Sequence, residues 1–478
     1  MTTVTCPLHE SGKISPDQTA IIGRDLEVRY GELDPMVSGT AENIEKAGIG
    51  RGDKVGIFMN TGFHSICLIL GLLRAGIISC PISTRLPKIA VREHLDLIGC
   101  NKLVAGKSMR EGGVLEDIAV YDPESLVSSS LTLNRGRNDE RIPIDQPATI
   151  CFTSGSTGNP KAVMHTFGNH YYSALGANMN LRLRSGDRWL LSLPLYHVGG
   201  MAILFRCISS GAGIVVMEPG QPLEDAITRQ GVTHLSVVST QLYRLLDKNL
   251  PKDALKPLKA VLVGGGETPA SLIDRAYANN LPVMPTYGLT EMNSQVTAMR
   301  PDSPPAKRYS AGVPLKYREI RILQDGEIQV KGQTLFEGYV RGSEIHCPLD
   351  KDGWFSTGDI GSMDEDGYLT VTGRKDNQFI SGGENVHAEE IERVLCEIPE
   401  IRHAVVVPVP DKEFGRRPVA FLKCEYSALD TNSIIRELEK YLPRFKIPVD
   451  FLPWPDTDTD GIKLSREYLK SMAEELRA

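Results

Sequence analysis

Short apolar runs alternate with amphipathic or densely apolar segments through the first 300 residues. Runs at 54–59 and 102–105 predict strands, and residues 63–73 are too uniformly apolar for a surface helix. Further apolar runs that end in small or polar residues occur at 189–195, 213–217, 234–238 and 260–263. Because strands that alternate with helices at this spacing form parallel sheets buried on both faces, the pattern predicts α/β layers.

The pattern changes at about residue 305. Segments 319–323, 327–330 and 368–371 alternate apolar and polar positions, and Asp-Gly turns at 325–326 and 366–367 join such segments. Two-residue alternation with tight Asp-Gly turns is typical of antiparallel strands. We therefore expect a β unit over about 305–373, either a small β-barrel-like structure or a curled sheet.

The last hundred residues carry apolar stripes of their own. Helical spacing at 388–398, 433–441 and 465–476 and strand-like runs at 404–409 and 419–424 predict a small α+β domain. We expect a large N-terminal domain over residues 1–375 and a C-terminal domain over 376–478.

Composition narrows the class of protein. The 478 residues are 41% hydrophobic and 24% charged, as in soluble globular proteins, and the net charge of −7 argues against a nucleic-acid partner. The start of the chain lacks the basic and apolar regions of a signal peptide, and Arg74 and Pro81 interrupt the most apolar window, so no membrane span is expected. Nine cysteines without a CxxC pair fit reduced thiols. These features predict a cytoplasmic protein.

A loop rich in hydroxyl groups and glycine follows the apolar run 148–152. Its backbone N–H groups and hydroxyls can wrap a polyphosphate, because glycine lets the backbone approach closely, and a lysine at its end adds positive charge. The spacing differs from a Walker A loop, since two residues separate the glycines and Ala162 follows the lysine. A Ser/Gly-rich surface loop is the alternative. The residues concerned are Thr153, Ser154, Gly155, Ser156, Thr157, Gly158 and Lys161.

Other predicted strand ends carry groups suited to a nucleotide. Thr290 offers a hydroxyl to a phosphate, Glu291 an oxygen ligand for Mg²⁺, and Tyr287 an aromatic face for a base. The sequence Thr-Gly-Asp predicts a turn that presents the carboxylate of Asp359, which suits a ribose diol. Arg374 can bridge a nucleotide or form a salt bridge between domains. The alternatives are a plain strand-end turn at 287–291 and an ordinary turn aspartate.

Two further residues have both a structural and a catalytic interpretation. His197 follows Leu-Pro-Leu-Tyr, where a packed core histidine is the simpler interpretation. Lys463 lies in a polar loop before the last helix, where most lysines are solvated. A catalytic Lys463 would have to reach a site more than 300 residues upstream in the sequence, which requires a mobile domain.

Taken together, these motifs resemble the adenylate-forming superfamily of acyl-CoA synthetases, peptide-synthetase adenylation domains and luciferases. The resemblance covers essentially the whole chain, in the same order: Thr153-Ser-Gly-Ser-Thr-Gly-x-Pro-Lys161, Tyr287-Gly-x-Thr-Glu291, Thr357-Gly-Asp359, Gly373-Arg-x-Asp376 and Lys463. It implies an α/β adenylate-forming fold with a mobile C-terminal cap.

The resemblance also implies a role for each motif in binding ATP and Mg²⁺. The residues from Thr153 to Lys161 would form a flexible loop over the β- and γ-phosphates. Gly264, Gly265 and Tyr287 would frame the adenine, Thr290 would meet the α-phosphate, and Glu291 would contact Mg²⁺. Asp359 and Arg374 would hold the ribose.

The remaining implied roles concern the catalytic lysine, the hinge of the cap domain and access for CoA. Asp376 matches the hinge of the cap domain, and Lys463 the catalytic lysine between the carboxylate and the α-phosphate. Gly382 and Gly383 match the acyl-CoA branch, where glycines give the pantetheine of CoA access. Ile462 separates Gly461 from Lys463, whereas many members have glycine directly before the lysine.

The segment 461–466, which contains this isoleucine, resembles the end of one subgroup, the o-succinylbenzoate–CoA ligases of menaquinone biosynthesis. The same subgroup is resembled by segments 189–198, 240–244, 258–262 and 411–415. In that subgroup an arginine at the place of Arg206 meets the second carboxylate of the substrate. A partly buried guanidinium needs an anionic partner, and the alternative partner is a protein carboxylate. The expected acyl-binding residues are His197, Arg206, Gly266, Ser294 and Gln295, and Gln295 replaces a small hydroxyl residue.

The sequence therefore predicts an ATP-dependent carboxylate–CoA ligase that releases AMP and pyrophosphate. Its partners would be a carboxylic acid, ATP and CoA, with o-succinylbenzoate as the acid. A CoA ligase for another aromatic or dicarboxylic acid, or a stand-alone adenylation enzyme that loads a carrier protein, are the alternatives. The sequence does not fix the oligomeric state, for which a homodimer is one option.

Overall fold

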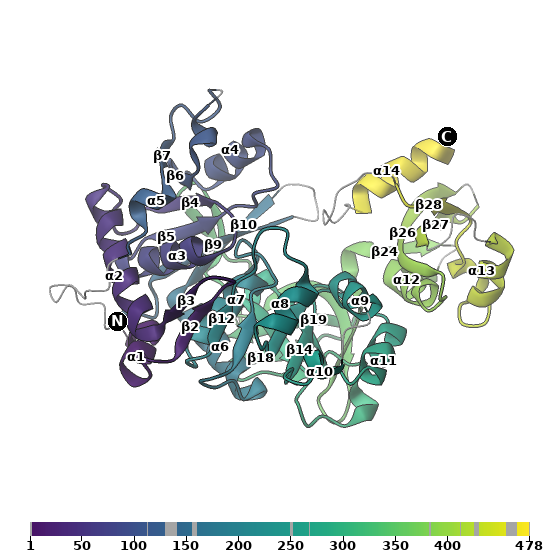
Figure 1. The fold of residues 1–478 in the computed structure, drawn as a ribbon. Coiled ribbons are helices and arrows are strands. Elements are labelled where there is room, and N and C mark those ends of the chain that lie inside the picture. The colour runs from purple at the N-terminus through teal and green to yellow at the C-terminus, as the bar shows by residue number, and fades with distance from the viewer. Residues whose placement is uncertain are drawn as a thin grey trace.

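The computed structural model describes residues 2–111, 113–129, 141–154, 160–248, 252–266, 268–381, 384–411, 413–424, 430–455 and 466–477. Two large sheets with helices around them make up most of the molecule, and the segments coloured yellow-green to yellow form a smaller body to one side (Figure 1). The predicted α/β layers are confirmed.

The first sheet has eight strands and combines three distant parts of the chain. Parallel strands from residues 54–121 form one half, and β9 joins them in parallel next to β5. Antiparallel pairing then continues through β10, β20 and β21. In spatial order the strands are β21 (Glu344–His346), β20 (Gly338–Arg341), β10 (Pro160–Thr166), β9 (Pro147–Ser154), β5 (Ile78–Pro81), β4 (Lys54–Phe58), β6 (Lys102–Ala105) and β7 (Ala119–Tyr121).

The second sheet has nine strands, and its central six are parallel. Hairpins add antiparallel strands at both ends. The order is β17 (Val313–Pro314), β16 (Ser294–Ala298), β15 (Val283–Leu289), β14 (Ala260–Val263), β13 (His234–Val237), β11 (Arg188–Leu190), β12 (Gly213–Val215), β2 (Thr19–Ile22) and β3 (Glu27–Arg29). A short pair, β1 (Thr3–Thr5) with β8 (Arg141–Pro143), lies outside both sheets.

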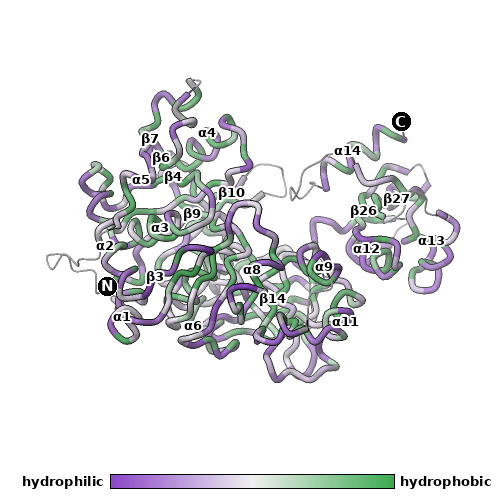
Figure 2. The backbone as a smooth tube through the Cα atoms, in the orientation of Figure 1, coloured by the Kyte–Doolittle hydropathy of each residue, from purple (hydrophilic) through white to green (hydrophobic). Residues whose placement is uncertain are grey.

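Helices cover these sheets, and the most apolar of them lies deepest. The helix α3 (Phe63–Ala75) is buried from Ser65 to Ala75, as its dense apolar run predicts, and is hydrophobic along most of its length in Figure 2. The other helices of this part are α1 (Pro7–Ile14), α2 (Tyr30–Lys46), α4 (Lys88–Leu97), α5 (Pro123–Leu126), α6 (Phe167–Leu181), α7 (Val198–Ile208), α8 (Leu223–Arg229), α9 (Ser239–Asp247), α10 (Lys252–Leu255) and α11 (Ala270–Ala278).

One predicted strand is much shorter than its apolar run. Residues 189–195 suggested a strand, but β11 ends at Leu190. The backbone N–H of Ser192 turns back to the carbonyl of Leu190 at 2.9 Å, and Pro194 has no N–H to donate to a neighbouring strand. The chain therefore leaves the sheet early and forms the loop that leads into α7.

The antiparallel unit expected after residue 305 is confirmed as a four-stranded sheet in the order β18 (Arg318–Ile322), β19 (Glu327–Gly332), β22 (Phe355–Met363) and β23 (Leu369–Arg374). Register shifts in β19 and β22 bend it. Residues 338–346 do not join it, because β20 and β21 pair with the eight-stranded sheet. A segment late in the chain, β20, thus lies beside β10, the strand that follows the candidate phosphate loop.

The C-terminal unit, from β24 to α14, has its own core. The long hairpin of β26 (Ile401–Asp411) and β27 (Gly415–Cys424) pairs in parallel with β28 (Phe451–Pro453), and β24 (Gln378–Ser381) pairs with β25 (Glu384–His387). The three helices are α12 (Ala388–Cys396), α13 (Thr431–Leu438) and α14 (Arg466–Arg477). The helix predicted at 433–441 begins earlier, because the side chain of Asp430 caps it by accepting from the N–H of Asn432.

Contacts between described residues link this unit to helices of the nine-stranded sheet. Glu397 accepts a hydrogen bond from the N–H of Ala270 at 3.1 Å, at the start of α11. The Arg402 guanidinium lies 5.0 Å from the ring centroid of Tyr243 on α9.

Among the described residues, no helix is long and apolar enough to cross a membrane.

Candidate active site

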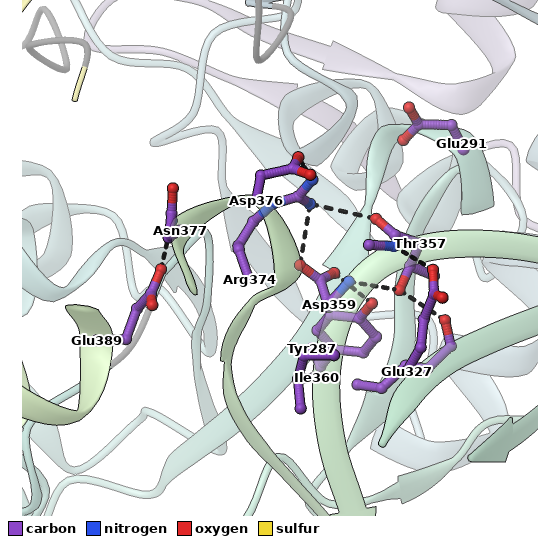
Figure 3. Close-up of polar contacts among 12 residues, drawn as sticks. Tyr287, Glu291, Glu327, Thr357, Asp359, Ile360, Arg374, Asp376, Asn377 and Glu389 are labelled. Carbon is purple, nitrogen blue, oxygen red and sulfur yellow. Dashed lines mark hydrogen bonds and ion pairs between the residues drawn. The ribbon is translucent and has the colours of Figure 1, made fainter. Parts of the chain in front are cut away.

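Tyr287, Asp359 and Arg374 come from two sheets and meet at one carboxylate. The Tyr287 hydroxyl donates to Asp359 Oδ2 at 2.6 Å, and Arg374 Nη1 donates to Asp359 Oδ1 at 3.0 Å (Figure 3). Tyr287 belongs to β15, whereas β22 and β23 place Asp359 directly opposite Arg374. The three side chains expected to bind the nucleotide are therefore in direct contact with one another.

Asp359 was expected in a turn, and this is wrong, because it lies inside β22. The strand stays paired with β19 on both sides of this point, and a residue with left-handed backbone, Gly358 at φ +73°, produces the local distortion. Arg374 packs closely here, since a Cβ on Gly358 would lie 3.0 Å from Arg374 Nη2. Similarly, residues 287–289 continue β15, and only 290–292 leave it as a 3₁₀ turn.

Burial shapes the electrostatics of this cluster. Desolvation raises the pKa of Asp359 above its ordinary value, while the hydrogen bond from Tyr287 and the charge of Arg374 act to lower it. Burial, followed by the charge of Asp359, raises the pKa of the Tyr287 hydroxyl. Tyr287 therefore remains a hydrogen-bond donor, and the Asp359 carboxylate depends on both partners for its charged form.

Arg374 and its neighbours connect this cluster to the start of the C-terminal unit. Arg374 Nη2 forms an ion pair with Asp376 at 3.0 Å, while Lys375 pairs with Asp325 at 2.9 Å and Glu327 at 3.0 Å. The next residue, Asn377, donates to Glu389 of α12. The sequence left two roles for Arg374, a contact with a nucleotide or a salt bridge between domains. Among the described residues, Arg374 forms ion pairs with Asp359 and with Asp376, where the predicted C-terminal domain begins.

The candidate phosphate loop joins the two strands of a β-hairpin, β9 and β10. Thr153 on β9 pairs directly with Lys161 on β10, so both ends of the loop are fixed next to each other. Ser154 is the last residue of β9. Residues Gly155, Ser156, Thr157 and Gly158 lie outside the described residues, as do Gly382, Gly383 and Lys463.

Lys161 and Glu291 both contact one side chain that the sequence did not single out. Tyr339 on β20 donates its hydroxyl to Glu291 Oε1 at 2.7 Å, and Lys161 Nζ lies 5.0 Å from the centroid of its ring. Burial and then the charge of Glu291 raise the pKa of Tyr339, so the hydroxyl keeps its proton. The expected phosphate lysine and metal carboxylate are thus neighbours of the same residue.

This group and the Asp359 group lie within electrostatic range of each other. Among smaller effects, Glu291 acts to raise the pKa of Asp359, and Arg374 acts to lower the pKa of Tyr339. Thr290, between the two groups in sequence, is held through its backbone, because His165 Nε2 lies 2.7 Å from its carbonyl oxygen. The Asp359 cluster and the group of Lys161, Glu291 and Tyr339 therefore lie near each other.

The glycines after β14 meet different demands. A Cβ on Gly264 would lie 2.9 Å from the Thr286 hydroxyl of β15, and Gly265 has φ +83°. Among the described residues, no atom lies within 4 Å of a Cβ placed on Gly266. Glycine is thus favoured by close packing at Gly264 and by the backbone conformation at Gly265, whereas the described residues leave room for a side chain at Gly266.

Arg206 is buried inside the large portion of the molecule on α7. Its side chain donates to the Ser294 hydroxyl at 3.3 Å and lies 5.3 Å from the centroid of the Trp189 ring. Its Nε has no hydrogen-bond partner among the described residues, and burial lowers the pKa of its guanidinium to about 10. The protein carboxylate considered as an alternative partner is not found in the described part of the chain.

Ser294 and Gln295 complete this region. Ser294 adopts φ +96°, which is rare for a residue with a side chain, so the fold holds its hydroxyl in a strained position. Gln295 is 4% exposed, and neither atom of its side-chain amide has a partner among the described residues. Buried amides without partners are rare in folded proteins, and this one lies next to the serine that contacts Arg206.

His197 precedes α7, the helix that carries Arg206. The residue is exposed at the surface, yet the protein around its remaining sides and the charge of Arg85 lower the pKa of its imidazole. The packed core histidine is therefore wrong for His197. Buried histidines do occur elsewhere, and two of them, His165 and His170, share the Thr149 hydroxyl at 3.4 and 2.8 Å.

Sequence reasoning missed several residues of this site. Tyr339 becomes a neighbour of Lys161 only when β20 pairs with β10, and His165 reaches Thr290 across 125 residues. Trp189 begins the segment 189–198, to which the sequence assigns no individual role, although its ring packs against Arg206. For His165 the sequence does hold one signal, because a histidine directly after the apolar run 162–164 is expected to be buried and then needs a polar partner.

The family comparison agrees with this geometry. Residues 8–340 match the model of the AMP-binding enzyme family, and residues 390–458 match the AMP-binding enzyme C-terminal domain. The chain belongs to the AMP-binding enzyme family.

Individual relatives narrow the class. A 2-succinylbenzoate–CoA ligase from Bacillus cereus is 32% identical over 481 aligned residues, which cover 98% of each chain. The o-succinylbenzoate CoA synthetase (MenE) of Bacillus subtilis, in complex with the acyl-adenylate intermediate OSB-AMP, superposes with a TM-score of 0.86 at 29% identity, over 99% of this chain and 98% of that one. The same Bacillus subtilis enzyme with ATP and a magnesium ion gives a TM-score of 0.87 at 30% identity, over 98% and 100%.

Proposed function

We propose that this protein is an ATP-dependent carboxylate–CoA ligase that forms an acyl-adenylate and then a thioester, with o-succinylbenzoate as its acid. The relatives are named for this activity, and a relative's structure contains the acyl-adenylate. The observation that carries the choice of acid is Arg206, a buried guanidinium whose partners among the described residues do not include a carboxylate. A dicarboxylate would leave one carboxylate for that guanidinium while the other reacts.

The nucleotide would bind across the two clusters. We assign the ribose to Asp359 and Arg374, the adenine to Tyr287 with Gly264 and Gly265, and the α-phosphate to Thr290. The loop from Thr153 to Lys161 would close over the outer phosphates. Because the Asp359 oxygens already accept bonds from Tyr287 and Arg374, the carboxylate is oriented before the ribose hydroxyls donate to it.

The donor set suits a magnesium ion that arrives with the nucleotide. The described residues contain no cluster of three or more side chains of the metal-binding kind, and Glu291 is the carboxylate beside the phosphate lysine. Mg²⁺ commonly takes one or two carboxylates together with phosphate oxygens, so Glu291 fits that role. When bound, the ion would neutralise charge on the phosphates.

In the first half-reaction an oxygen of the acid's carboxylate attacks the α-phosphorus of ATP. A new P–O bond forms as the bond to pyrophosphate breaks, and negative charge is redistributed over the phosphates. Lys463 is proposed to lie beside the attacking carboxylate and the α-phosphate. Catalysis here is mainly positioning and charge stabilisation.

In the second half-reaction the thiolate of CoA attacks the acyl carbon of the adenylate. The C–S bond forms, the C–O bond to the phosphate breaks, and AMP leaves. We propose that residues 376–478 act as a cap that turns at Asp376 between the two steps, which removes Lys463 and lets pantetheine pass Gly382 and Gly383. His197, Gly266, Ser294 and Gln295 would line the acyl pocket with Arg206.

A product assay over a panel of carboxylic acids, with and without CoA, tests this proposal. We expect AMP and pyrophosphate from o-succinylbenzoate and ATP, and the thioester only when CoA is added. ADP and phosphate as products would overturn adenylation. Faster turnover with a simple monocarboxylate would overturn the acid assignment and leave the ligase assignment intact.

A further inference from the structure

Tyr339 makes two contacts that no local motif predicts. Its hydroxyl donates to Glu291 Oε1 at 2.7 Å, and the ammonium of Lys161 lies 5.0 Å from its ring centroid. Glu291 and Lys161 carry opposite charges, and both are proposed to act on the phosphates of ATP. Tyr339 therefore touches the two charged groups on which phosphate binding is proposed to depend.

The fold fixes Tyr339 relative to both. Tyr339 pairs with Val163 in the antiparallel β10–β20 ladder, and Lys161 lies two residues from Val163 on the same face of β10. On the other side, the N–H of Phe336 donates to the backbone carbonyl of Glu291 at 2.8 Å. The segment 336–339 is thus joined to Glu291 through both backbone and side chain, and to Lys161 through strand pairing.

The chemistry of a tyrosine suits this position. Its hydroxyl satisfies one oxygen of a carboxylate without neutralising the charge, and its ring face attracts an ammonium without bonding to it. A lysine and a glutamate left to themselves at short distance would form an ion pair. Such a pair would occupy the groups that should bind phosphate and cation, and the described residues contain no ion pair between Lys161 and Glu291.

We propose that Tyr339 is a positioning residue for the metal–phosphate contacts of ATP. It holds Glu291 Oε1 so that the other carboxylate oxygen faces the cation, and it keeps Lys161 from pairing with Glu291. This inference rests on the proposed function, because it assumes that Mg²⁺ and ATP bind at this site.

Two substitutions separate the hydroxyl from the ring. In Tyr339→Phe the ring remains over Lys161 and the hydrogen bond to Glu291 is lost, so we expect the Mg²⁺ concentration for half-maximal ATP binding to rise about 3- to 10-fold. ATP binding in EDTA should stay within about twofold of the wild type. In Tyr339→Leu the ring is also lost, and we expect ATP affinity in EDTA to fall as well, because Lys161 is then able to pair with Glu291. Titration calorimetry of ATP into the full chain, at several Mg²⁺ concentrations and in EDTA, measures both quantities without turnover.

Tyr368 supplies a matched control. Its hydroxyl bonds to Ser303 at 3.2 Å and Lys307 Nζ lies 5.2 Å from its ring centroid, but neither residue belongs to the proposed site. Tyr368→Phe should leave ATP binding and its Mg²⁺ dependence unchanged. A second control is the double variant with Glu291→Gln, in which Tyr339→Phe should have no additional effect on Mg²⁺ dependence.

The outcomes distinguish this inference from the function on which it rests. If the wild type releases ADP and phosphate, the proposed function itself is contradicted. If its ATP binding does not depend on Mg²⁺, the metal role of Glu291 and this inference are both wrong, while adenylation stands. If the wild type depends on Mg²⁺ and Tyr339→Phe matches it, the positioning role of Tyr339 is wrong while the ligase assignment stands. A fall in melting temperature with unchanged Mg²⁺ dependence would likewise assign Tyr339 to the fold alone.

Discussion

Arg206 and Arg318 are buried within electrostatic range of each other, and neither guanidinium has a carboxylate partner in the described part of the chain. Burial, with a contribution from Arg206, lowers the pKa of Arg318 to about 9. The two guanidiniums differ in their hydrogen-bond partners. Arg318 donates to the backbone carbonyls of Gln295, Lys316 and Ser173, whereas Arg206 has one side-chain hydroxyl, that of Ser294, and an unpartnered Nε.

This difference predicts opposite effects of the two substitutions. Arg206→Gln should raise the KM for o-succinylbenzoate, with a loss in kcat/KM equivalent to roughly 2–5 kcal/mol, as for one member of a buried charged pair. Removing an unpaired buried charge should also leave the ligand-free protein as stable as the wild type or more stable. Steady-state kinetics and chemical denaturation measure both.

Arg318→Gln is the comparison variant. It leaves backbone carbonyls without donors, so it should lower stability and affect all acids alike. Benzoate-like acids without a second carboxylate should be poor substrates of the wild type and nearly insensitive to Arg206→Gln. A loss of the same size for mono- and dicarboxylates in Arg206→Gln would contradict the assigned role.

Tyr287→Phe should weaken ATP binding and move its pH dependence. The variant loses the hydrogen bond that acts to lower the pKa of Asp359, so that pKa, already raised by burial, should rise further. Because the ionised carboxylate is the form proposed to bind ribose, the acid limb of ATP binding should shift to higher pH. Dissociation constants for ATP from pH 5 to 8 test this, and an unchanged midpoint would show that Asp359 does not govern the limb. Tyr277→Phe, which loses a bond to a backbone carbonyl outside the site, is the control.

His165 should make the fold sensitive to acid. Burial lowers the pKa of its imidazole from 6.5 to about 4 in the folded protein. A base whose pKa is depressed by folding contributes stability that is present above pH 6.5 and is lost as the pH falls toward 4, because the unfolded chain takes up the proton first. The free energy of unfolding of His165→Gln should therefore fall by about 2 kcal/mol less than that of the wild type between pH 7.5 and pH 5. Equal falls in urea denaturation at the two pH values would contradict a neutral buried His165.

The sequence predicted well those features that local pattern determines. Strands such as β4 and β6 and the helix α3 follow from runs of apolar residues, and the nucleotide candidates Tyr287, Asp359 and Arg374 do meet. The sequence did not predict contacts that depend on which strands pair in the folded protein. Tyr339 has no local signal that connects it with Lys161, and only the β10–β20 ladder brings them together. Asp359 was expected in a turn because Gly358 suggests one, but the strand pairing continues past it.

Lys463 lies outside the described residues, so its role is a prediction from the sequence alone. Lys463→Ala should slow adenylation about 10²–10³-fold, the usual cost of one preorganised charge-stabilising group. Thioester formation from supplied acyl-adenylate and CoA should be largely spared, because the lysine is proposed to have left the site by then. Separate assays of the two half-reactions measure this, and equal losses in both would assign Lys463 to the fold or to docking of the cap.

Asp376 offers a test of the proposed hinge that separates backbone from side chain. Its carboxylate pairs with Arg374 at 3.0 Å, so Asp376→Ala removes an ion pair beside the proposed ribose site but leaves the backbone free to rotate. Asp376→Pro removes the same carboxylate and also fixes φ. If residues 376–478 turn here between half-reactions, and the proline traps the adenylating arrangement, Asp376→Pro should slow thioester formation more than adenylation. Asp376→Ala should change the two rates by similar, smaller factors through Arg374. Rates for both half-reactions in both variants decide the matter, because a side-chain effect alone would make alanine and proline equivalent.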